Sequence, residues 1–308
     1  MPNLSTLWQR ALLLQAIRQF FIDRGYLEVD TPVRLPVFIP EAYIVPERSE
    51  SWFLQASPEQ CMKRLLAAGC HKIFQICRCF RKGERGSRHL PEFTMLEWYR
   101  VDSDYTDLMN ECEDLLIFVA GILSGSGDCR EIQRKSATGA ARTISLRKPW
   151  EKITVAEAFR RHATVPLAEA LRNDTFDEIL CREIEPHLGR FAPAFLYDYP
   201  ASLGSLARNR EDDSSVAERF EIYIDGIELA NGFSELTDPV EQRHRFAMEQ
   251  EKALRNGRDH GPMPDKFLRD LEQMGPAAGI ALGIDRLAMV LLDAASIDDV
   301  IPFPPEEL

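Results

Sequence analysis

The sequence of 308 residues contains no long apolar run. Its longest such run, residues 115–123, is about half of the roughly 20 residues that a membrane-spanning helix needs. The N-terminal stretch has Arg10 and Arg18 among its apolar residues and no small-residue cleavage site, so it does not have the form of a signal peptide. We therefore expect no membrane span and a cytoplasmic location.

Cysteine is sparse, and its seven residues are an odd number that favours reduced thiols over a disulfide framework. Cys77 and Cys79 follow Cys61, Cys70 and His71, but no CxxC pair provides the spacing of a tetrahedral zinc site. Basic residues are outnumbered, because 37 Lys and Arg oppose 49 Asp and Glu and leave a net charge of −12. This total disfavours a nucleic acid as the main partner, although it is compatible with a small basic patch.

The hydrophobic pattern mixes helical and strand periodicities. Helices are expected at residues 6–25, from residue 58, at 105–123, 241–256 and 285–293, and with breaks over 153–188. Strands are expected at residues 26–36, 72–81, 91–100, 194–199, 220–230 and 279–283. The Gly/Ser-rich, basic residues 124–150 indicate a mobile loop. Strands in antiparallel pairs with helices outside them predict an α+β fold.

Residues 220–230 predict a β-hairpin, because their central Asp-Gly pair favours a two-residue type I′ turn. In regular register Tyr223 pairs with Glu228 and Glu221 with Ala230, so both glutamates lie on one face and the apolar residues on the other. Two carboxylates on one face repel each other without a cation. The two carboxylates are suited to hold a Mg²⁺ ion that also binds a phosphate. The alternative is that both glutamates lie on a solvent-exposed outer face and bind nothing.

A second strand pair is joined by the basic, glycine-containing loop of residues 82–90. Strand alternation places Phe93, Glu97 and Tyr99 on one face, and Arg81 ends the preceding strand. Such a face offers a guanidinium for a carboxylate or phosphate, acceptors for a cation, and a ring for a base. Loop cations that could neutralise a polyphosphate are Lys82, Arg85, Arg88 and His89. An ordinary hairpin with a basic turn is the alternative.

A third segment places a cation at the start of a helix. Residues 279–283 form a glycine-spaced strand, and Asp285 and Arg286 follow at the N-terminus of a predicted helix. Because helix N-termini favour anions, Arg286 is a candidate phosphate ligand.

Taken in order, these segments resemble the class II aminoacyl-tRNA synthetases of the lysyl branch, and within it the elongation factor P lysine ligases. YLEVDTPVRLP (26–36) is similar to motif 1, FRKGERGSRHLPEFTMLEWYR (80–100) to motif 2, and GIALGIDRLAMVLL (279–292) to motif 3. RFEIYIDGIELANGFSELTD (219–238) resembles the lysine-pocket and metal segment. The resemblance implies one catalytic domain over residues 1–308, with a mainly antiparallel sheet of six to seven strands flanked by helices. It also implies that the anticodon-binding OB domain is absent.

The resemblance further implies an activity. Enzymes of this group activate (R)-β-lysine with ATP and Mg²⁺ as the adenylate, and transfer it to the ε-amine of a lysine of elongation factor P. Ser57 and Ala281 match the ligases, whereas the synthetases usually have Ala and Gly at these positions, so we expect L-lysine to be the poorer substrate. Motif 1 implies a homodimer, and no tRNA partner is expected.

Site residues follow from the resemblance position by position. Arg81 and Arg286 are implied to be catalytic, with Arg81 on the substrate carboxylate and the α-phosphate. The residues implied to bind the lysine substrate are Ser57, Glu59, Glu97, Tyr99, Asn231, Glu235 and Ala281. Those implied to bind ATP are Arg81, Glu84, His89, Phe93, Glu228, Gly283 and Arg286. Glu221 and Glu228 are implied to hold Mg²⁺.

One departure from the family concerns motif 2, where FRNE reads Phe80-Arg81-Lys82-Gly83. Our hypothesis is that Glu84 replaces the missing glutamate through the flexible Gly83, and unchanged ATP affinity in a Glu84→Ala variant would contradict it. Two other functions remain open, a truncated lysyl-tRNA synthetase and a catalytically silent lysine-binding regulator. The second would have no reason to keep both Arg286 and the metal carboxylates.

Overall fold

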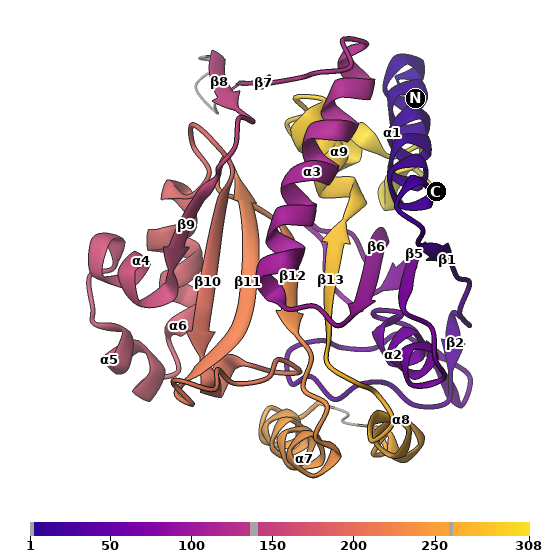
Figure 1. Ribbon diagram of the computed structural model, residues 1–308, viewed down its shortest axis with the longest axis vertical. Coiled ribbons are helices and arrows are strands. Elements are labelled where there is room, and N and C mark those ends of the chain that lie inside the picture. Colours follow the sequence, from indigo (N-terminus) through magenta and orange to yellow (C-terminus); the bar gives the residue numbers. More distant parts are fainter. Residues whose placement is uncertain (1–2, 136–140, 259–260) are drawn as a thin grey trace.

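An eight-stranded sheet lies at the centre of the computed structural model, which describes residues 3–135, 141–258 and 261–308 (Figure 1). In spatial order the strands are β1 (Leu27–Glu28), β5 (Lys72–Phe80), β6 (Glu92–Val101), β13 (Ala277–Gly283), β12 (Ile227–Ser234), β11 (Val216–Ile224), β10 (Ala194–Pro200) and β9 (Glu151–Thr154). The inner pairs are antiparallel, and β1 and β9 add to the edges in parallel. The predicted α+β class is confirmed, and the two short edge strands bring the sheet to eight strands, where six to seven were predicted.

Three helices cover one face of the sheet and form the main core. They are α1 (Leu4–Asp23), α3 (Tyr105–Ser124) and α9 (Ile284–Leu291). Figure 1 shows α3 lying across β12 and β13, with α1 and α9 beside it. The buried core joins Ile17, Leu108, Ile222 and Leu282 from these helices and strands. Because this face takes the apolar residues, the alternate residues of the same strands point to the opposite face.

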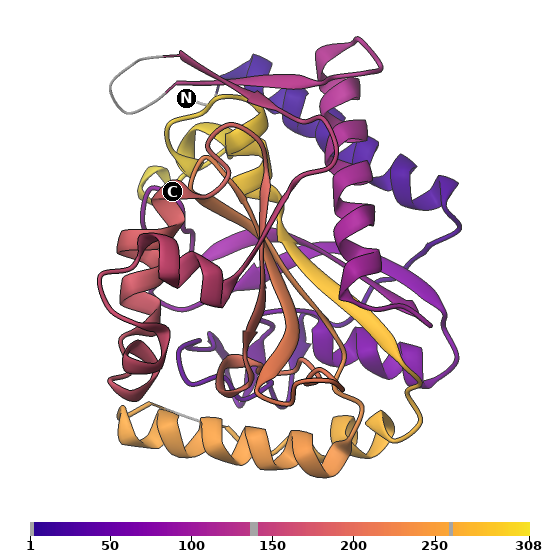
Figure 2. The same cartoon turned by 60° about the vertical axis from the view of Figure 1, so that its left-hand side comes forward.

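The remaining helices form two smaller clusters. Helices α2 (Glu59–Ala67), α7 (Pro239–Arg255) and α8 (Asp265–Leu271) share buried residues such as Met62, Phe246 and Phe267. Figure 2 shows the long orange helix α7 running beneath the lower end of the sheet. Helices α4 (Val155–His162), α5 (Leu167–Arg172) and α6 (Phe176–Ile179) pack near β9 and β10. A small sheet of β2 (Arg34–Leu35), β4 (Trp52–Leu54) and β3 (Arg48–Ser49) completes the fold.

Residues 124–150 differ from the expected loop. Their described part contains an antiparallel pair, β7 (Glu131–Lys135) and β8 (Ala141–Ser145), while residues 136–140 lie outside the described chain. Ile132, Ile144 and Leu146 are buried in the main core. The strands therefore form because a few alternating apolar residues reach the core, a signal that the polar composition conceals.

The hairpin of β11 and β12 has the predicted turn but a different register. Asp225 and Gly226 both have positive φ, as a type I′ turn requires. A β-bulge then shifts the pairing, so that Glu221 lies opposite Asn231 instead of the predicted Ala230. The shift keeps Glu221 and Glu228 on one face and adds Asn231 to it.

Other elements agree with the sequence pattern in kind and differ at their ends. Helix α1 is capped by Asn3, whose side chain accepts a hydrogen bond from the Ser5 N–H. Helix α8 was not predicted, because it is short and follows a proline-containing stretch. In the described residues, no helix has the length and apolar character needed to cross a membrane.

Candidate active site

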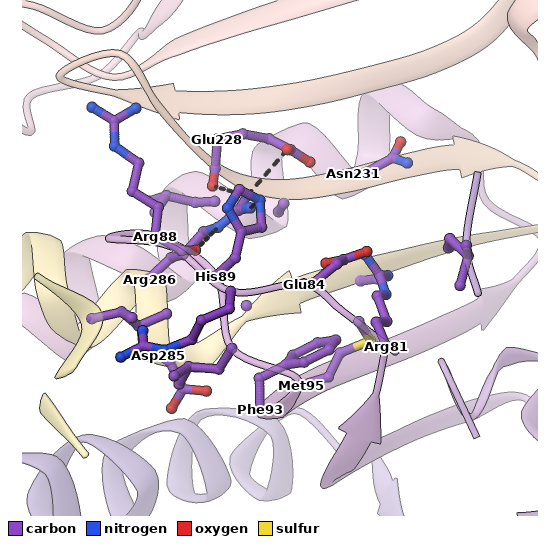
Figure 3. A pocket seen from close by; sticks show the side chains of 18 of the residues that line it. Arg81, Glu84, Arg88, His89, Phe93, Met95, Glu228, Asn231, Asp285 and Arg286 are labelled. Carbon is purple, nitrogen blue, oxygen red and sulfur yellow. Dashed lines mark hydrogen bonds and ion pairs between the residues drawn. The ribbon is translucent and has the colours of Figure 1, made fainter. Parts of the chain in front are cut away.

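A cavity of about 550 Å³ opens on the sheet face opposite the main core (Figure 3). Strands β6, β12 and β13, the loop between β5 and β6, and the start of α9 surround it. Of the predicted site residues, its lining includes Arg81, Glu84, His89, Phe93, Glu228, Asn231, Ala281, Gly283 and Arg286. Three segments that are far apart in the sequence therefore meet at one cavity.

Strand pairing explains why these side chains converge. Glu221 pairs with Asn231, Asn231 with Ala281, Ala281 with Glu97, and Glu97 with Gln75. Cross-strand partners point to the same face, so the five residues form one row across the sheet. Ala281 is the smallest side chain of this row and leaves space between Asn231 and Glu97.

A cluster of three carboxylates, Glu59, Glu97 and Glu235, lies beside the cavity without lining it, and we call it and the residues that contact it the carboxylate pocket. Glu97 is buried, and its two carboxylate oxygens accept hydrogen bonds from the Ser57 hydroxyl (2.6 Å) and the Tyr99 hydroxyl (2.7 Å). The Ser57 oxygen also accepts a hydrogen bond from the Glu59 N–H at the start of α2 (3.0 Å). Three of the residues expected to bind the lysine substrate, Ser57, Glu97 and Tyr99, are therefore joined by hydrogen bonds, and Ser57 links them to the helix that carries Glu59.

Lys63 is a residue of this pocket that the sequence reasoning missed. Its ammonium lies 2.6 Å from a carboxylate oxygen of Glu59 and also pairs with Glu235. The side chain is only 1% exposed, and its nitrogen lies 5.1 Å from the centroid of the Phe233 ring. The spacing of four between Glu59 and Lys63 on a predicted helix was the available signal.

Gly279 makes room for this pocket. A Cβ atom at Gly279 would lie 2.2 Å from the Tyr99 ring and 2.5 Å from Glu235 Oε1. Within the described chain, Glu235 Oε1 is buried and has no hydrogen-bond partner. Because buried polar atoms are normally hydrogen-bonded, this oxygen has the chemistry to accept a hydrogen bond from a cationic ligand.

The electrostatics of the pocket show the cost of burying carboxylates together. Burial raises the pKa of Glu235 to about 8, and Lys63 only partly opposes it. Burial, with a contribution from Glu59, likewise raises the pKa of Glu97 to about 8. For Lys63 burial would lower the pKa, but Glu235 and Glu59 outweigh it and raise the pKa. The empty pocket therefore holds more carboxylates than cations that could compensate them.

Arg81 provides the opposite charge beside this pocket. Its guanidinium lies 5.2 Å from the centroid of the Phe93 ring, and both residues line the cavity. Its Nε is buried and makes no hydrogen bond with any described residue. A desolvated donor that faces a cavity is expected to bind an anion, because leaving it unpaired costs about 1–3 kcal/mol.

At the other end, Arg286 is already held by neighbouring groups. Its Nη1 lies 3.1 Å from Glu228 Oε2, and its Nη2 lies 2.7 Å from His89 Nε2, as Figure 3 shows. Burial, with a contribution from Arg286, lowers the pKa of His89. Because arginine only donates, a neutral His89 accepts this bond at Nε2. Arg286 and His89 thus present one connected group to the cavity.

The two proposed metal carboxylates, Glu221 and Glu228, each have an arginine partner in the described chain. Glu221 is 6% exposed and accepts hydrogen bonds from Arg219 Nη2 and from the Tyr223 hydroxyl, each at 2.7 Å. Arg286 pairs with Glu228 in the same way. Burial and Glu228 still raise the pKa of Glu221, although Arg219 opposes them. The described residues contain no cluster of three or more His, Cys, Asp or Glu that could hold a metal ion.

Two arginines of the basic loop already have partners, so fewer of its cations are available for a polyphosphate than predicted. Arg85 pairs with Asp298 (2.9 Å) and Glu306 (2.7 Å), and Arg88 donates to the Gly226 carbonyl (3.0 Å). These contacts attach the loop to the C-terminal segment and to the β11–β12 turn. Gly83 has a φ of +77°, which glycine adopts without strain, and it precedes Glu84 in the cavity wall.

A buried ion pair connects the first helix to this site. Arg10 Nη2 lies 2.5 Å from Asp285 Oδ1 and donates to Thr94 Oγ1 at 2.9 Å. Asp285 in turn accepts the Thr94 N–H at 2.7 Å. The residues next to Asp285 and Thr94, Arg286 and Phe93, are therefore held in place from α1.

An antiparallel sheet with two arginines, Arg81 and Arg286, and a carboxylate pocket on one face is the arrangement of a class II synthetase catalytic core. Residues 3–307 match the family of class II tRNA synthetases (D, K and N), and the chain belongs to it. The chain is accordingly an ATP-using enzyme of the ligase type.

The curated relatives are more specific. The chain is similar to "Elongation factor P--(R)-beta-lysine ligase" of Pectobacterium carotovorum subsp. carotovorum, with 39% identity over 99% of this chain and 96% of the relative. The protein of the same name from Pectobacterium atrosepticum has the same identity and coverage. The one from Salmonella gallinarum is 39% identical over 98% of this chain and 95% of its own length.

Proposed function

We propose that the chain activates (R)-β-lysine with ATP, and L-lysine less well, and transfers the β-lysyl group to the ε-amine of a lysine of elongation factor P. The carboxylate of the amino acid attacks the α-phosphorus of ATP and releases pyrophosphate. The ε-amine then attacks the adenylate and releases AMP. Neither step needs a protein nucleophile, so catalysis rests on positioning and charge. A cytoplasmic location fits a protein acceptor of this kind.

The observation that supports this function best is that three carboxylates surround one cation, Lys63, in the pocket. When Glu59, Glu97 and Glu235 are ionised and Lys63 is protonated, the pocket has a net charge of −2. A diamino acid brings two ammonium groups, and Arg81 receives its carboxylate. An amino acid with one ammonium would leave a buried carboxylate uncompensated, which costs several kcal/mol.

The nucleotide end of the site has a matching role. In our proposal, Phe93 stacks on adenine, Arg286 binds the γ-phosphate, and His89 and Glu84 also contact ATP. Glu228 and Glu221 fit a divalent cation, because they share one face and Glu228 lines the cavity. Mg²⁺ held there would neutralise the phosphate charge, and Glu221 would exchange its bonds from Arg219 and Tyr223 for the ion.

A homodimer is also part of the proposal. Leu4 and Trp8 on α1 and Leu27 on β1 are 72%, 77% and 57% exposed. They belong to the N-terminal region that includes motif 1, and exposed apolar groups of this size mark interaction surfaces. A second copy of the chain would cover them.

ATP–pyrophosphate exchange followed by transfer tests the function. We expect exchange with (R)-β-lysine, weaker exchange with L-lysine, and label transfer to elongation factor P. Transfer to tRNA instead would establish a lysyl-tRNA synthetase. No exchange with either amino acid would leave the lysine-binding regulator.

Amino-acid binding should strengthen as the pH rises. Glu97 and Glu235, each with a pKa of about 8, are largely protonated at pH 7, whereas the substrate ammonium groups need them ionised. The KM for the amino acid in the exchange reaction should therefore fall between pH 6.5 and 8.5, by up to about tenfold per pH unit for each carboxylate. The KM for ATP is the internal control. An amino-acid KM that does not change over this range would contradict the assignment.

A further inference from the structure

One carboxylate at the cavity has no role in the proposed reaction so far. Glu41 lies in the irregular segment between β2 and β3, and it lines the large cavity. It also lines a small adjoining pocket that contains Ser57 and Glu59. The position of Glu41 is therefore the junction between the nucleotide cavity and the amino-acid pocket, where the activated carboxyl group must form.

The backbone beside Glu41 is held firmly. The N–H of Ala42 donates to Glu249 Oε2 on α7 at 2.8 Å, and the Ala42 carbonyl accepts from Arg258 Nη1 at 2.9 Å. Ala42 itself is only 1% exposed. These contacts are long-range, so they fix the position of the segment relative to the sheet.

The charged groups around Glu41 come from several elements. Arg81 follows β5, Arg219 lies on β11, Glu59 starts α2 and Glu249 lies on α7. Loss of hydration is the main effect and raises the pKa of Glu41 to about 7, with Glu59 and Glu249 raising it and the two arginines lowering it. A carboxylate with this pKa can both accept and release a proton near neutrality.

The second step of the reaction needs such a group, whereas the first does not. In the first step the nucleophile is already a carboxylate. In the second, the acceptor is a lysine ε-ammonium with an ordinary pKa of about 10.4, so fewer than about one in a thousand is a free amine at pH 7. The other glutamates near the reacting centre are assigned to the substrate ammonium groups, to ATP or to Mg²⁺. Asp285, which also lines the cavity, is paired with Arg10.

We propose that Glu41 is the general base of the transfer step, an inference that rests on the function proposed above. Glu41 accepts one proton from the acceptor ammonium, and the nitrogen lone pair attacks the carbonyl carbon of the adenylate. As the N–C bond forms, the C–O bond to AMP breaks and its electron pair leaves with the AMP phosphate. The remaining extra proton on nitrogen passes to solvent, and the product is the amide.

The isosteric variant Glu41→Gln tests this role, because it should slow the transfer step and leave adenylate formation nearly unchanged. ATP–pyrophosphate exchange, and trapping of the adenylate with hydroxylamine, which is neutral near pH 7, should stay within about twofold of the wild type. Transfer to elongation factor P should fall by roughly 100-fold or more, the usual range for a general base. The wild-type transfer rate should rise through pH 7 and level off above it as Glu41 ionises. The variant depends on the free amine, so its lower rate should keep rising by about tenfold per pH unit without levelling off. Glu41→Asp should recover part of the rate.

Glu47→Gln is the matched control, because Glu47 lies in the same segment and lines neither cavity. It should leave both steps unchanged. Normal transfer by Glu41→Gln would overturn the proposal. Loss of exchange together with transfer would also overturn it, since Glu41 would then act in substrate binding or folding. If the wild type itself shows no transfer to elongation factor P, the proposed function fails, and that result is distinct from either outcome.

Discussion

Replacing Arg81 with alanine is expected to lower ATP–pyrophosphate exchange on the order of 10²-fold or more. Arg81 Nε is buried without a hydrogen-bond partner in the described chain, and the guanidinium lies beside the Phe93 ring at the cavity. It can therefore hold the substrate carboxylate and stabilise the charge that develops on the α-phosphate. The loss should appear mainly in kcat, because the charge is greatest in the transition state.

Arg78→Ala is the control for this variant. Arg78 is on β5, three residues before Arg81, which directly follows this strand, so alternation places the two side chains on opposite sides of the sheet. It is half-exposed and lies 3.7 Å from Glu92. Near-normal exchange in Arg81→Ala, or an equal loss in Arg78→Ala, would refute the role assigned to Arg81.

Gly279→Ala is expected to raise the KM for the amino acid by about 10- to 100-fold while the KM for ATP stays near that of the wild type. The added methyl would lie 2.2 Å from the Tyr99 ring and 2.5 Å from Glu235 Oε1, so both groups must shift. Overpacking of this kind costs about 1–3 kcal/mol. The displacement of Tyr99 and Glu235 should mainly weaken binding of the substrate's side-chain ammonium.

Gly275→Ala separates this effect from a general effect of replacing glycine. A Cβ at Gly275 would meet nothing within 4 Å, and Gly275 lies just before β13. Thermal unfolding of both variants should accompany the kinetics. An amino-acid KM unchanged in Gly279→Ala would show that Tyr99 and Glu235 do not form the binding pocket.

Some of the site could be predicted because it depends on local alternation. Strand alternation in the sequence predicts that Glu97 and Tyr99 lie on one face. The structure confirms this, because the Tyr99 hydroxyl donates a hydrogen bond to the Glu97 carboxylate. The Asp-Gly turn likewise made Glu221 and Glu228 neighbours on one face. Both inferences need only the period of two of a strand and the length of a turn.

Other features depend on contacts that no local pattern contains. The bulge that adds Asn231 to the row, the ion pairs of Lys63 and the position of Glu41 each require segments distant in sequence to pack together. The hairpin at β7 and β8 is a similar case, because only its burial against the core distinguishes it from a polar loop.

The sequence by itself determined the fold class, the motif positions and the face on which most site residues lie, since these follow from periodicity and turn chemistry. Tertiary structure alone decided the charge state of the site. Burial raises the pKa values of Glu97, Glu235 and Glu41, and it leaves Arg81 Nε without a partner in the described chain. Loss of hydration depends on which elements cover a group, and that is set by packing across the whole sheet.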